Sequence, residues 1–478
     1  MNLSKVGQQG FKHLLLIVVT SRVSAFIAQW VMGIFLFKED FGLIAIISVV
    51  YLFAAGFKEV GLYQVLQENR GNFEAMAPSL TASAQVLNLS GVAILVAAAP
   101  LIANYYNDPR LVWITVALVL AMPFNIAALP YKARLSIRFD FKRISKVEST
   151  SVLVSNATLA ALAAMGAGIY SYVASQIILT LVTYWMYRHG QQPIAWGIRP
   201  NRKSFGQFVS RSKWLILSSY MSNIATRGDY LVLSLLLSKA SLGLYYFSYQ
   251  LMAAAVQLVG MALNHLLLPL FSAIKDDVDR TRAGLRKAGD ALSLITGALC
   301  LSLLVWFPLL IHTVWSGKWN DAIPLALIVT LAVPPRLLSS PLGSSALEAM
   351  GRYRSRTLVS VADAASLILF VWIGGTYHGV IGACVAIGLQ RCTVGMLFYF
   401  SASKFVGISA SGALVQLARH LSPYAITSAS LAIVIFKIVG YSNFVQGDFA
   451  LTIALFAGTM SLYLALSHKK LVEYAFKR

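Results

Sequence analysis

Apolar runs of about 20 residues, separated by short polar or charged segments, recur along the whole 478-residue sequence. The hydrophobic core of one soluble domain cannot bury this much apolar surface, but each run is long enough to cross the hydrocarbon of a bilayer as a helix. Hydrophobic residues make up 58% of the sequence and charged residues 12%, and the mean hydropathy is +0.70. We therefore predict an all-α polytopic membrane protein.

The runs predict about fourteen transmembrane helices. The first run is too long and too interrupted for a cleaved signal peptide, so we expect it to be retained as a helix. The expected spans are residues 11–37, 41–63, 80–104, 110–130, 149–168, 170–187, 214–237, 243–267, 291–315, 322–346, 358–376, 379–402, 421–440 and 448–467.

The sequence also contains an internal repeat. At an offset of 201 residues, VMGIFLFKEDFGLIAI (31–46) aligns with VLSLLLSKASLGLYYF (232–247), which matches Lys38 to Lys239. This offset spans about six of the predicted helices. We therefore expect two six-helix lobes of like orientation, followed by a final helix pair.

The expected organisation has four parts. They are an N-lobe of helices 1–6 at residues 1–187, a basic cytoplasmic interlobe loop at 188–213, a C-lobe of helices 7–12 at 214–402, and helices 13–14 with a cytoplasmic tail at 403–478. Transporters built from repeats often place their substrate site between the repeats, near the bilayer midplane.

The net charge of +21 comes from Lys and Arg that gather in alternate loops rather than in one soluble domain. One set of loops holds roughly 29 basic residues and the other roughly 5, which is the asymmetry of positive-inside topology. We therefore expect both termini in the cytoplasm, and no nucleic-acid partner. The richest segments, 131–143, 188–213 and 275–287, are interpreted as orientation signals.

Nearly all function is expected within the membrane, because the outside loops are very short and no inside loop is long enough to form a domain. The three cysteines have no CxxC spacing, and no His cluster has the spacing of metal ligands. No phosphate-binding loop of an ATPase is present. We therefore expect no catalytic residues, no cofactor and no metal site.

Charged residues inside the apolar spans are the most informative positions. Arg22 lies about 16 Å along the first span, close to the middle of the hydrocarbon core. A charge at this depth is costly, so it normally faces a partner or a watery cavity. Gln29 lies on the same helical face as Arg22, together with small residues. This face is predicted to point away from lipid.

The seventh span, at 214–237, carries a wider polar arc that includes Asn223, Arg227, Asp229 and Tyr230. The second span adds Lys58 and Glu59 near its cytoplasmic end. Two interpretations remain open. These charges either line a net-cationic, solvated cavity, or they pair with one another and tie the lobes together. Glu59 and Asp229 are candidates for ion coupling or for charge pairing.

A second set of charges, Arg336, Asp363 and Arg391, lies near the proline-interrupted stretch VPPRLLSSP (333–341). Proline inside a membrane helix frees backbone carbonyls, and an arginine can satisfy them. For this set we favour a structural role.

Four stretches resemble a known family. They are APLIANYYNDPRL (99–111), ALPYKARLSIRFDFKRIS (128–145), GDYLVLSLLLSKASLGLYYFSYQL (228–251) and LLLPLFSAIKDD (266–277). In order and spacing they are similar to the polysaccharide transporter family, the Wzx-type lipid-linked oligosaccharide flippases of the multidrug/oligosaccharidyl-lipid/polysaccharide (MOP) exporter superfamily.

The resemblance implies a flippase of the bacterial inner membrane that moves an undecaprenyl-pyrophosphate-linked oligosaccharide by alternating access, for exopolysaccharide, capsule or O-antigen synthesis. It also implies that cationic cavity residues hold the pyrophosphate, here Arg22, Lys58 and Arg227. Arginine suits this role, because its planar fork donates two charge-assisted hydrogen bonds. Helices 13 and 14 would form a groove for the polyprenyl tail. Membrane lipids, a polymerase and other assembly proteins are the implied partners.

Two alternatives belong to other functional classes. A multidrug or cation antiporter of the same superfamily would need a net-acidic cavity, whereas Arg and Lys outnumber Asp and Glu at depth in this sequence. A membrane ligase or polymerase acting on lipid-linked sugars would need catalytic carboxylates or His on an outside loop of some size, and the outside segments are short.

Overall fold

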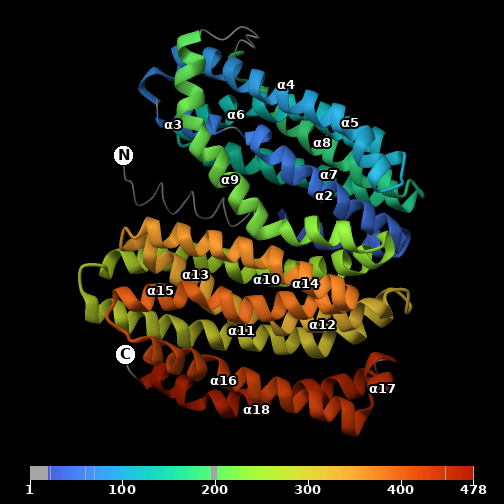
Figure 1. The fold of residues 1–478 in the computed structure, drawn as a ribbon, viewed down its shortest axis with the longest axis vertical. Helices are drawn as coiled ribbons and strands as arrows, with labels where there is room; N and C mark the ends of the chain where they lie inside the picture. Colours follow the sequence, from blue (N-terminus) through green and yellow to red (C-terminus); the bar gives the residue numbers. More distant parts are fainter. Residues whose placement is uncertain are drawn as a thin grey trace. The chain divides into compact units, whose positions relative to one another are not determined.

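The computed structural model describes residues 20–21, 23–59, 61–68, 70–194, 202–446 and 448–476. Within these ranges the regular structure is helical and contains no strand. The chain divides into two compact units, Met1–Tyr230 and Leu231–Arg478. In Figure 1 the first unit runs from blue to green and the second from green to red.

The first unit contains a short apolar helix over Val23–Phe35 and most of the blue and green helices of Figure 1. Its long helices pack in sequence-adjacent pairs, and α7 and α8 lie side by side. The helices are α2 (Lys38–Glu59), α3 (Leu62–Glu68), α4 (Phe73–Tyr105), α5 (Arg110–Leu120), α6 (Met122–Ile137), α7 (Phe141–Ala164), α8 (Ile169–Arg188) and the greater part of α9 (Arg202–Leu236).

The second unit places α16 and α18 side by side and packs both against α11. Its helices are α10 (Lys239–Ile274), α11 (Val278–Val314), α12 (Ile323–Leu331), α13 (Val333–Ala349), α14 (Tyr353–Thr393), α15 (Leu397–Phe405), α16 (Ala410–Val434), α17 (Tyr441–Gln446) and α18 (Phe449–Phe476).

The two segments aligned by the internal repeat form the same local structure. In each, a helix ends, two non-helical residues follow, and the next helix starts at the matched lysine, Lys38 or Lys239. A side-chain oxygen fixes each start, because Asp40 accepts from the Phe37 amide and Ser238 accepts from the Ser241 amide.

Proline breaks one helix in each unit. α5 ends at Leu120 and α6 restarts at Met122, with Pro123 in its first turn; α12 ends at Leu331 and α13 restarts at Val333, with Pro334 in its first turn. Proline lacks an amide hydrogen and crowds the preceding turn, so the helical ladder is interrupted before it. The helix formed by α5 and α6 also continues beyond residue 130, where we predicted a basic loop.

A sharp break divides α14. The backbone leaves helical geometry at His378, and Gly379 has φ 58°. Glycine adopts this left-handed conformation without the steric cost of a Cβ atom. The break separates the two predicted spans 358–376 and 379–402.

The predicted class is confirmed: this is an all-helical polytopic membrane protein. In the described ranges nine helices are long and apolar enough to cross a bilayer, and each predicted span overlaps helical residues. The count of fourteen stays a prediction. Helix ends differ from the predicted spans, because hydropathy marks entry into hydrocarbon while helical hydrogen bonding continues. For example, α11 begins at Val278 instead of 291, where Asp277 caps it by accepting from the Arg280 amide at 3.0 Å.

The distribution of side chains agrees with a lipid solvent. Large apolar residues lie on the surface; Trp113 on α5, for example, is 74% exposed. Conversely, polar residues such as Ser83, Thr296 and Gln390 are fully buried. In lipid an apolar side chain loses nothing by exposure, whereas a polar one needs a partner inside the protein.

Candidate functional site

A polar cavity of about 270 Å³ lies inside the first unit. It lies among α2, α5, α6, α7 and α8, close to the proline break between α5 and α6. The break brings Asn125, in the first turn of α6, to the cavity wall. The polar lining residues are Ser21, Tyr51, Asn125, Glu148, Gln176, Thr180 and Thr183. A polar cavity among apolar helices needs a polar occupant or water, because empty cavities in proteins are normally apolar.

The carboxylate of the cavity is neutralised. Glu148 on α7 forms an ion pair with Lys132 on α6, with 2.5 Å between Nζ and Oε1. The Tyr187 hydroxyl donates a hydrogen bond to the same oxygen at 3.1 Å. Glu148 therefore contributes little net negative charge to the cavity, which makes it a poor site for a cationic ligand.

Arg227 on α9 lies beside this cavity. Its guanidinium lies within electrostatic range of Tyr51, which lines the cavity, and of Tyr172. α9 is held against α2 by the Tyr220 hydroxyl, which donates to the Phe53 carbonyl at 2.6 Å. The Arg227 side chain is exposed, and within the described part of the chain it has no hydrogen bond or ion pair. An exposed guanidinium without a counterion, next to aromatic hydroxyls, suits an anionic group.

The other predicted site residues are distributed as follows. Asp229 is 3% exposed, and Tyr230 and Gln29 are also buried. Asn223 is half-buried on the same helix as Arg227. None of these four lines the cavity described above. The described structure therefore brings Arg227, but not the whole predicted set, to this cavity.

Three predicted residues cannot be placed with the cavity. Arg22 lies outside the described residues. Lys58 and Glu59 end α2, but their side chains also lie outside the described part. Their proposed contacts with an anionic ligand remain predictions.

Sequence reasoning missed the cavity residues Tyr51, Glu148 and Gln176. Each is a polar residue within or at the edge of a predicted span, which was a usable signal. However, these residues lie on three different spans, so their meeting can be predicted only if the pairing of those helices is known, and hydropathy does not specify that α7 packs on α8.

Arg134, within the segment 131–143 that we interpreted as an orientation signal, also makes structural contacts. It is 5% exposed, and its Nε and Nη2 atoms donate to the two carboxylate oxygens of Glu74 at 2.9 and 2.6 Å. Its Nη1 atom donates to the Gln192 carbonyl at 2.8 Å. The amide of Ile194 also donates to the Tyr131 hydroxyl. Arg134 and Tyr131 therefore anchor the first residues of the interlobe loop on α6.

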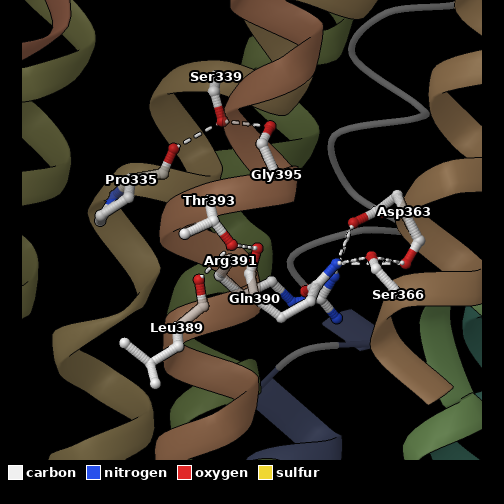
Figure 2. A network of polar contacts seen from close by, with 9 residues as sticks. All are labelled: Pro335, Ser339, Asp363, Ser366, Leu389, Gln390, Arg391, Thr393 and Gly395. Carbon is white, nitrogen blue, oxygen red and sulfur yellow. Dashed lines mark hydrogen bonds and ion pairs between the residues drawn. The ribbon is translucent and has the colours of Figure 1, made fainter. Parts of the chain in front are cut away.

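The second unit holds the Asp363 and Arg391 predicted as a structural pair. Figure 2 shows them facing each other across the two halves of α14, with 3.4 Å between Nη1 and Oδ1. Gln390 is the closer partner, because its Nε2 atom donates to the same carboxylate oxygen at 2.8 Å and to the Ser366 hydroxyl at 3.0 Å. This network crosses the break in α14 and joins its two halves.

The backbone carbonyls near the prolines of this region bond partners other than the arginine that we predicted. The Ser339 hydroxyl, not Arg336, lies at hydrogen-bonding distance from the Pro335 carbonyl, at 2.7 Å, and from the Gly395 carbonyl, at 2.9 Å (Figure 2). The carbonyl that Pro335 leaves without a helical donor is that of Leu331, four residues earlier, and it accepts from the Tyr424 hydroxyl at 3.4 Å.

A buried polar pair, unforeseen from the sequence, attaches the final helices to α11. His420 Nδ1 on α16 lies 2.9 Å from Asp290 Oδ1 on α11, and both residues are buried. On α18 the Tyr463 hydroxyl donates to the Ser293 carbonyl at 2.6 Å. The opposite faces of these helices expose large apolar residues, for example Val415.

Comparison with known proteins gives one family model, described as "Polysaccharide biosynthesis protein", that matches residues 31–324. The teichuronic acid biosynthesis protein TuaB of Bacillus subtilis (strain 168) is 26% identical over 265 residues, a match that covers 54% of this chain and 54% of that protein. This chain thus spans about half the length of that relative. The lipopolysaccharide biosynthesis protein WzxC of Escherichia coli (strain K12) is 24% identical over 372 residues, which cover 76% of this chain and 74% of that protein.

Solved structures share the fold. A lipid II flippase, MurJ, in an inward closed conformation has a TM-score of 0.72 at 14% identity, over 97% of this chain and 100% of that chain. An inward-facing multidrug resistance transporter of the MATE family has a TM-score of 0.60 at 12% identity, over 82% of this chain and 94% of that chain. The fold is therefore that of the MOP superfamily.

Proposed function

The chain belongs to the polysaccharide biosynthesis protein family and has a transporter fold, and from this premise we propose its substrate and mechanism. We propose that it translocates an undecaprenyl-pyrophosphate-linked oligosaccharide repeat unit across the bacterial inner membrane by alternating access. The polymer that is built from this unit is an exopolysaccharide, a capsule or an O-antigen.

The observation that carries the proposal is the charge balance beside the polar cavity. Arg227 has no counterion in the described part of the chain, whereas Glu148 in the cavity is already paired with Lys132. This arrangement leaves the Arg227 guanidinium available to an anion. A pyrophosphate that leaves water for the membrane interior loses its hydration, and a guanidinium offsets part of that cost with charge-assisted hydrogen bonds.

The remaining predicted residues extend the same site in this proposal. Arg22 and Lys58 are additional cationic partners of the pyrophosphate, and Gln29, Asn223 and Tyr230 are polar contacts near it. Glu59 and Asp229 serve ion coupling or charge pairing, since carboxylates in membrane spans are commonly functional.

The proposed topology has both termini in the cytoplasm, with the lobes at 1–187 and 214–402 as the moving parts. Helices α16 and α18 are the proposed groove for the polyprenyl tail, which their exposed apolar faces suit. A polymerase and other assembly proteins are the proposed partners, in addition to membrane lipids.

A cation antiporter is the alternative from the same superfamily, and the cavity does not favour it. A cationic drug requires an unneutralised carboxylate, but Glu148 accepts from both Lys132 and Tyr187. The relatives and the structural neighbours reported above are biosynthesis and transport proteins, so a transport role is also favoured over a ligase or polymerase.

We expect cells that lack this protein to build the lipid-linked repeat unit and retain it on the cytoplasmic face of the inner membrane. Polymer should disappear while the intermediate accumulates, protected from a membrane-impermeant glycosidase added to spheroplasts. A ligase or polymerase defect would instead leave the intermediate open to that glycosidase. Accumulation of digestible intermediate in the deletion strain would therefore overturn the flippase proposal.

A further inference from the structure

The first unit has a second basic feature, whose lining shares no residue with the cavity. At one end of the α7–α8 pair, a groove of about 730 Å³ is formed by the first turns of α7 and the last turn of α8. Its lining includes Arg143 and Lys146 from α7 and Arg188 and His189 from the end of α8. Trp185, one turn before the end of α8, also lines it and is 61% exposed.

Hydrogen bonds hold the two arginines of this groove in position, and these bonds do not neutralise their charge. Arg143 donates a hydrogen bond to the His189 carbonyl, where the chain leaves α8. Arg188 donates to the Tyr184 hydroxyl at 3.0 Å, and its guanidinium carbon lies 5.7 Å from the centre of the Trp185 ring. In the described ranges, no ion pair engages Arg143, Lys146 or Arg188. Two helices therefore present fixed positive charge to one groove.

Two other basic grooves provide an internal comparison. The groove at the end of α6 contains Glu74 together with Arg134 and Arg138. The groove between α11 and the start of α14 contains Asp276 and Glu348 together with its basic residues. In the first, one carboxylate offsets one of the two arginines, and in the second, two carboxylates offset two cations. By contrast, no acidic residue of the described ranges lines the α7–α8 groove.

The residues around the groove have the composition of the layer where a bilayer changes from hydrocarbon to headgroups. Both α7 and α8 are apolar enough to span a membrane, and their basic residues gather at the shared end. An exposed tryptophan one turn further in is typical of the membrane interface, where the indole contacts acyl chains and headgroups together. Arginine and lysine beyond it reach the layer that contains lipid phosphates.

We propose that this groove binds the headgroup of an anionic phospholipid. The phosphodiester lies against Lys146 and Arg188, Arg143 contributes at longer range, and the first acyl segments pack on Trp185. This site is separate from the pyrophosphate site proposed above, and it does not depend on the flippase proposal. Its chemistry follows from unbalanced positive charge next to an interfacial aromatic side chain.

The test uses purified full-length protein in nanodiscs of phosphatidylcholine, with or without added phosphatidylglycerol. We expect phosphatidylglycerol to raise the melting temperature of the native protein, because a ligand that binds the folded state stabilises it by mass action. Native mass spectrometry should detect bound phosphatidylglycerol. Lys146→Ala combined with Arg188→Ala should weaken this binding by at least about tenfold, since two charge-assisted contacts are lost.

The matched control is Lys142→Ala. Lys142 is an exposed lysine on the same turns of α7 that does not line the groove, so binding should be unchanged. Equal melting temperatures in pure phosphatidylcholine would show that the double variant folds. Unchanged phosphatidylglycerol binding in the double variant, or an equal loss in Lys142→Ala, would overturn the proposal. Displacement of the lipid by an equal concentration of inorganic phosphate would overturn it as well, because the groove would then be a site for free phosphate.

Discussion

Polymer export is expected to fall to background when Arg227 is replaced by alanine, while the protein still inserts and accumulates at its normal level. The Arg227 side chain is exposed beside Tyr51 and has no ion pair in the described part of the chain, so its removal leaves no buried partner unsatisfied. The variant instead loses a contact with the substrate. Arg227→Lys should restore export only partly, because an ammonium keeps the charge but not the planar fork that engages two phosphate oxygens.

The measurements for Arg227 are surface polymer, membrane protein level and melting temperature in detergent. Arg138→Ala is the matched control, because Arg138 is an exposed arginine of the same unit outside the cavity lining; export should be unchanged. A competing explanation is that Arg227 serves to balance the buried Asp229. In that case Arg227→Ala combined with Asp229→Ala would recover export, and this recovery would contradict a direct role in binding substrate.

The largest loss of stability is expected for Arg134→Ala. Arg134 is almost fully buried and makes two hydrogen bonds to Glu74 and one to the Gln192 carbonyl. We expect a loss of about 2–3 kcal/mol, below the cost for a fully buried pair, because water already screens the 61% exposed Glu74 side chain. The anchored start of the interlobe loop should become more accessible to protease.

Thermal melting in detergent, together with limited proteolysis near residue 194, measures this effect. Glu74→Gln should cost less, because the amide oxygen still accepts from Arg134 and the bond from Arg134 to the Gln192 carbonyl remains. If Arg134→Ala melts within a degree of the native protein and shows no new cleavage, its contacts carry no stability and the segment is only an orientation signal.

Apolar length was enough to predict the helical class, because a chain in hydrocarbon has few ways to satisfy its backbone other than helices. It was not enough to place helix ends or breaks. Pro123 and Pro334 are visible in the sequence, but whether a proline breaks a helix or bends it depends on the packing around it. The break at Gly379 had a clearer signal, since it falls between two predicted spans.

The site was predictable only in part, for a related reason. Arg227 stood out because a charge inside an apolar run is costly wherever that helix packs. The roles of Glu148 and Gln176 depend on neighbours from other helices. The role of Arg134 depends on Glu74, which is 60 residues away in the chain. Helix pairing therefore determined which charges are paired and which stay available.

In our proposal the polar cavity in the first unit holds the pyrophosphate of the lipid-linked oligosaccharide during transport. A photoreactive amino acid at position 176, in place of the cavity residue Gln176, tests it directly in growing cells. After irradiation, mass spectrometry should find the protein joined to the oligosaccharide lipid, and this adduct should vanish in cells unable to assemble the repeat unit. The same amino acid at position 113, in place of the exposed Trp113, should capture only phospholipid. Phospholipid adducts alone at both positions, in cells that make the repeat unit, would contradict the claim.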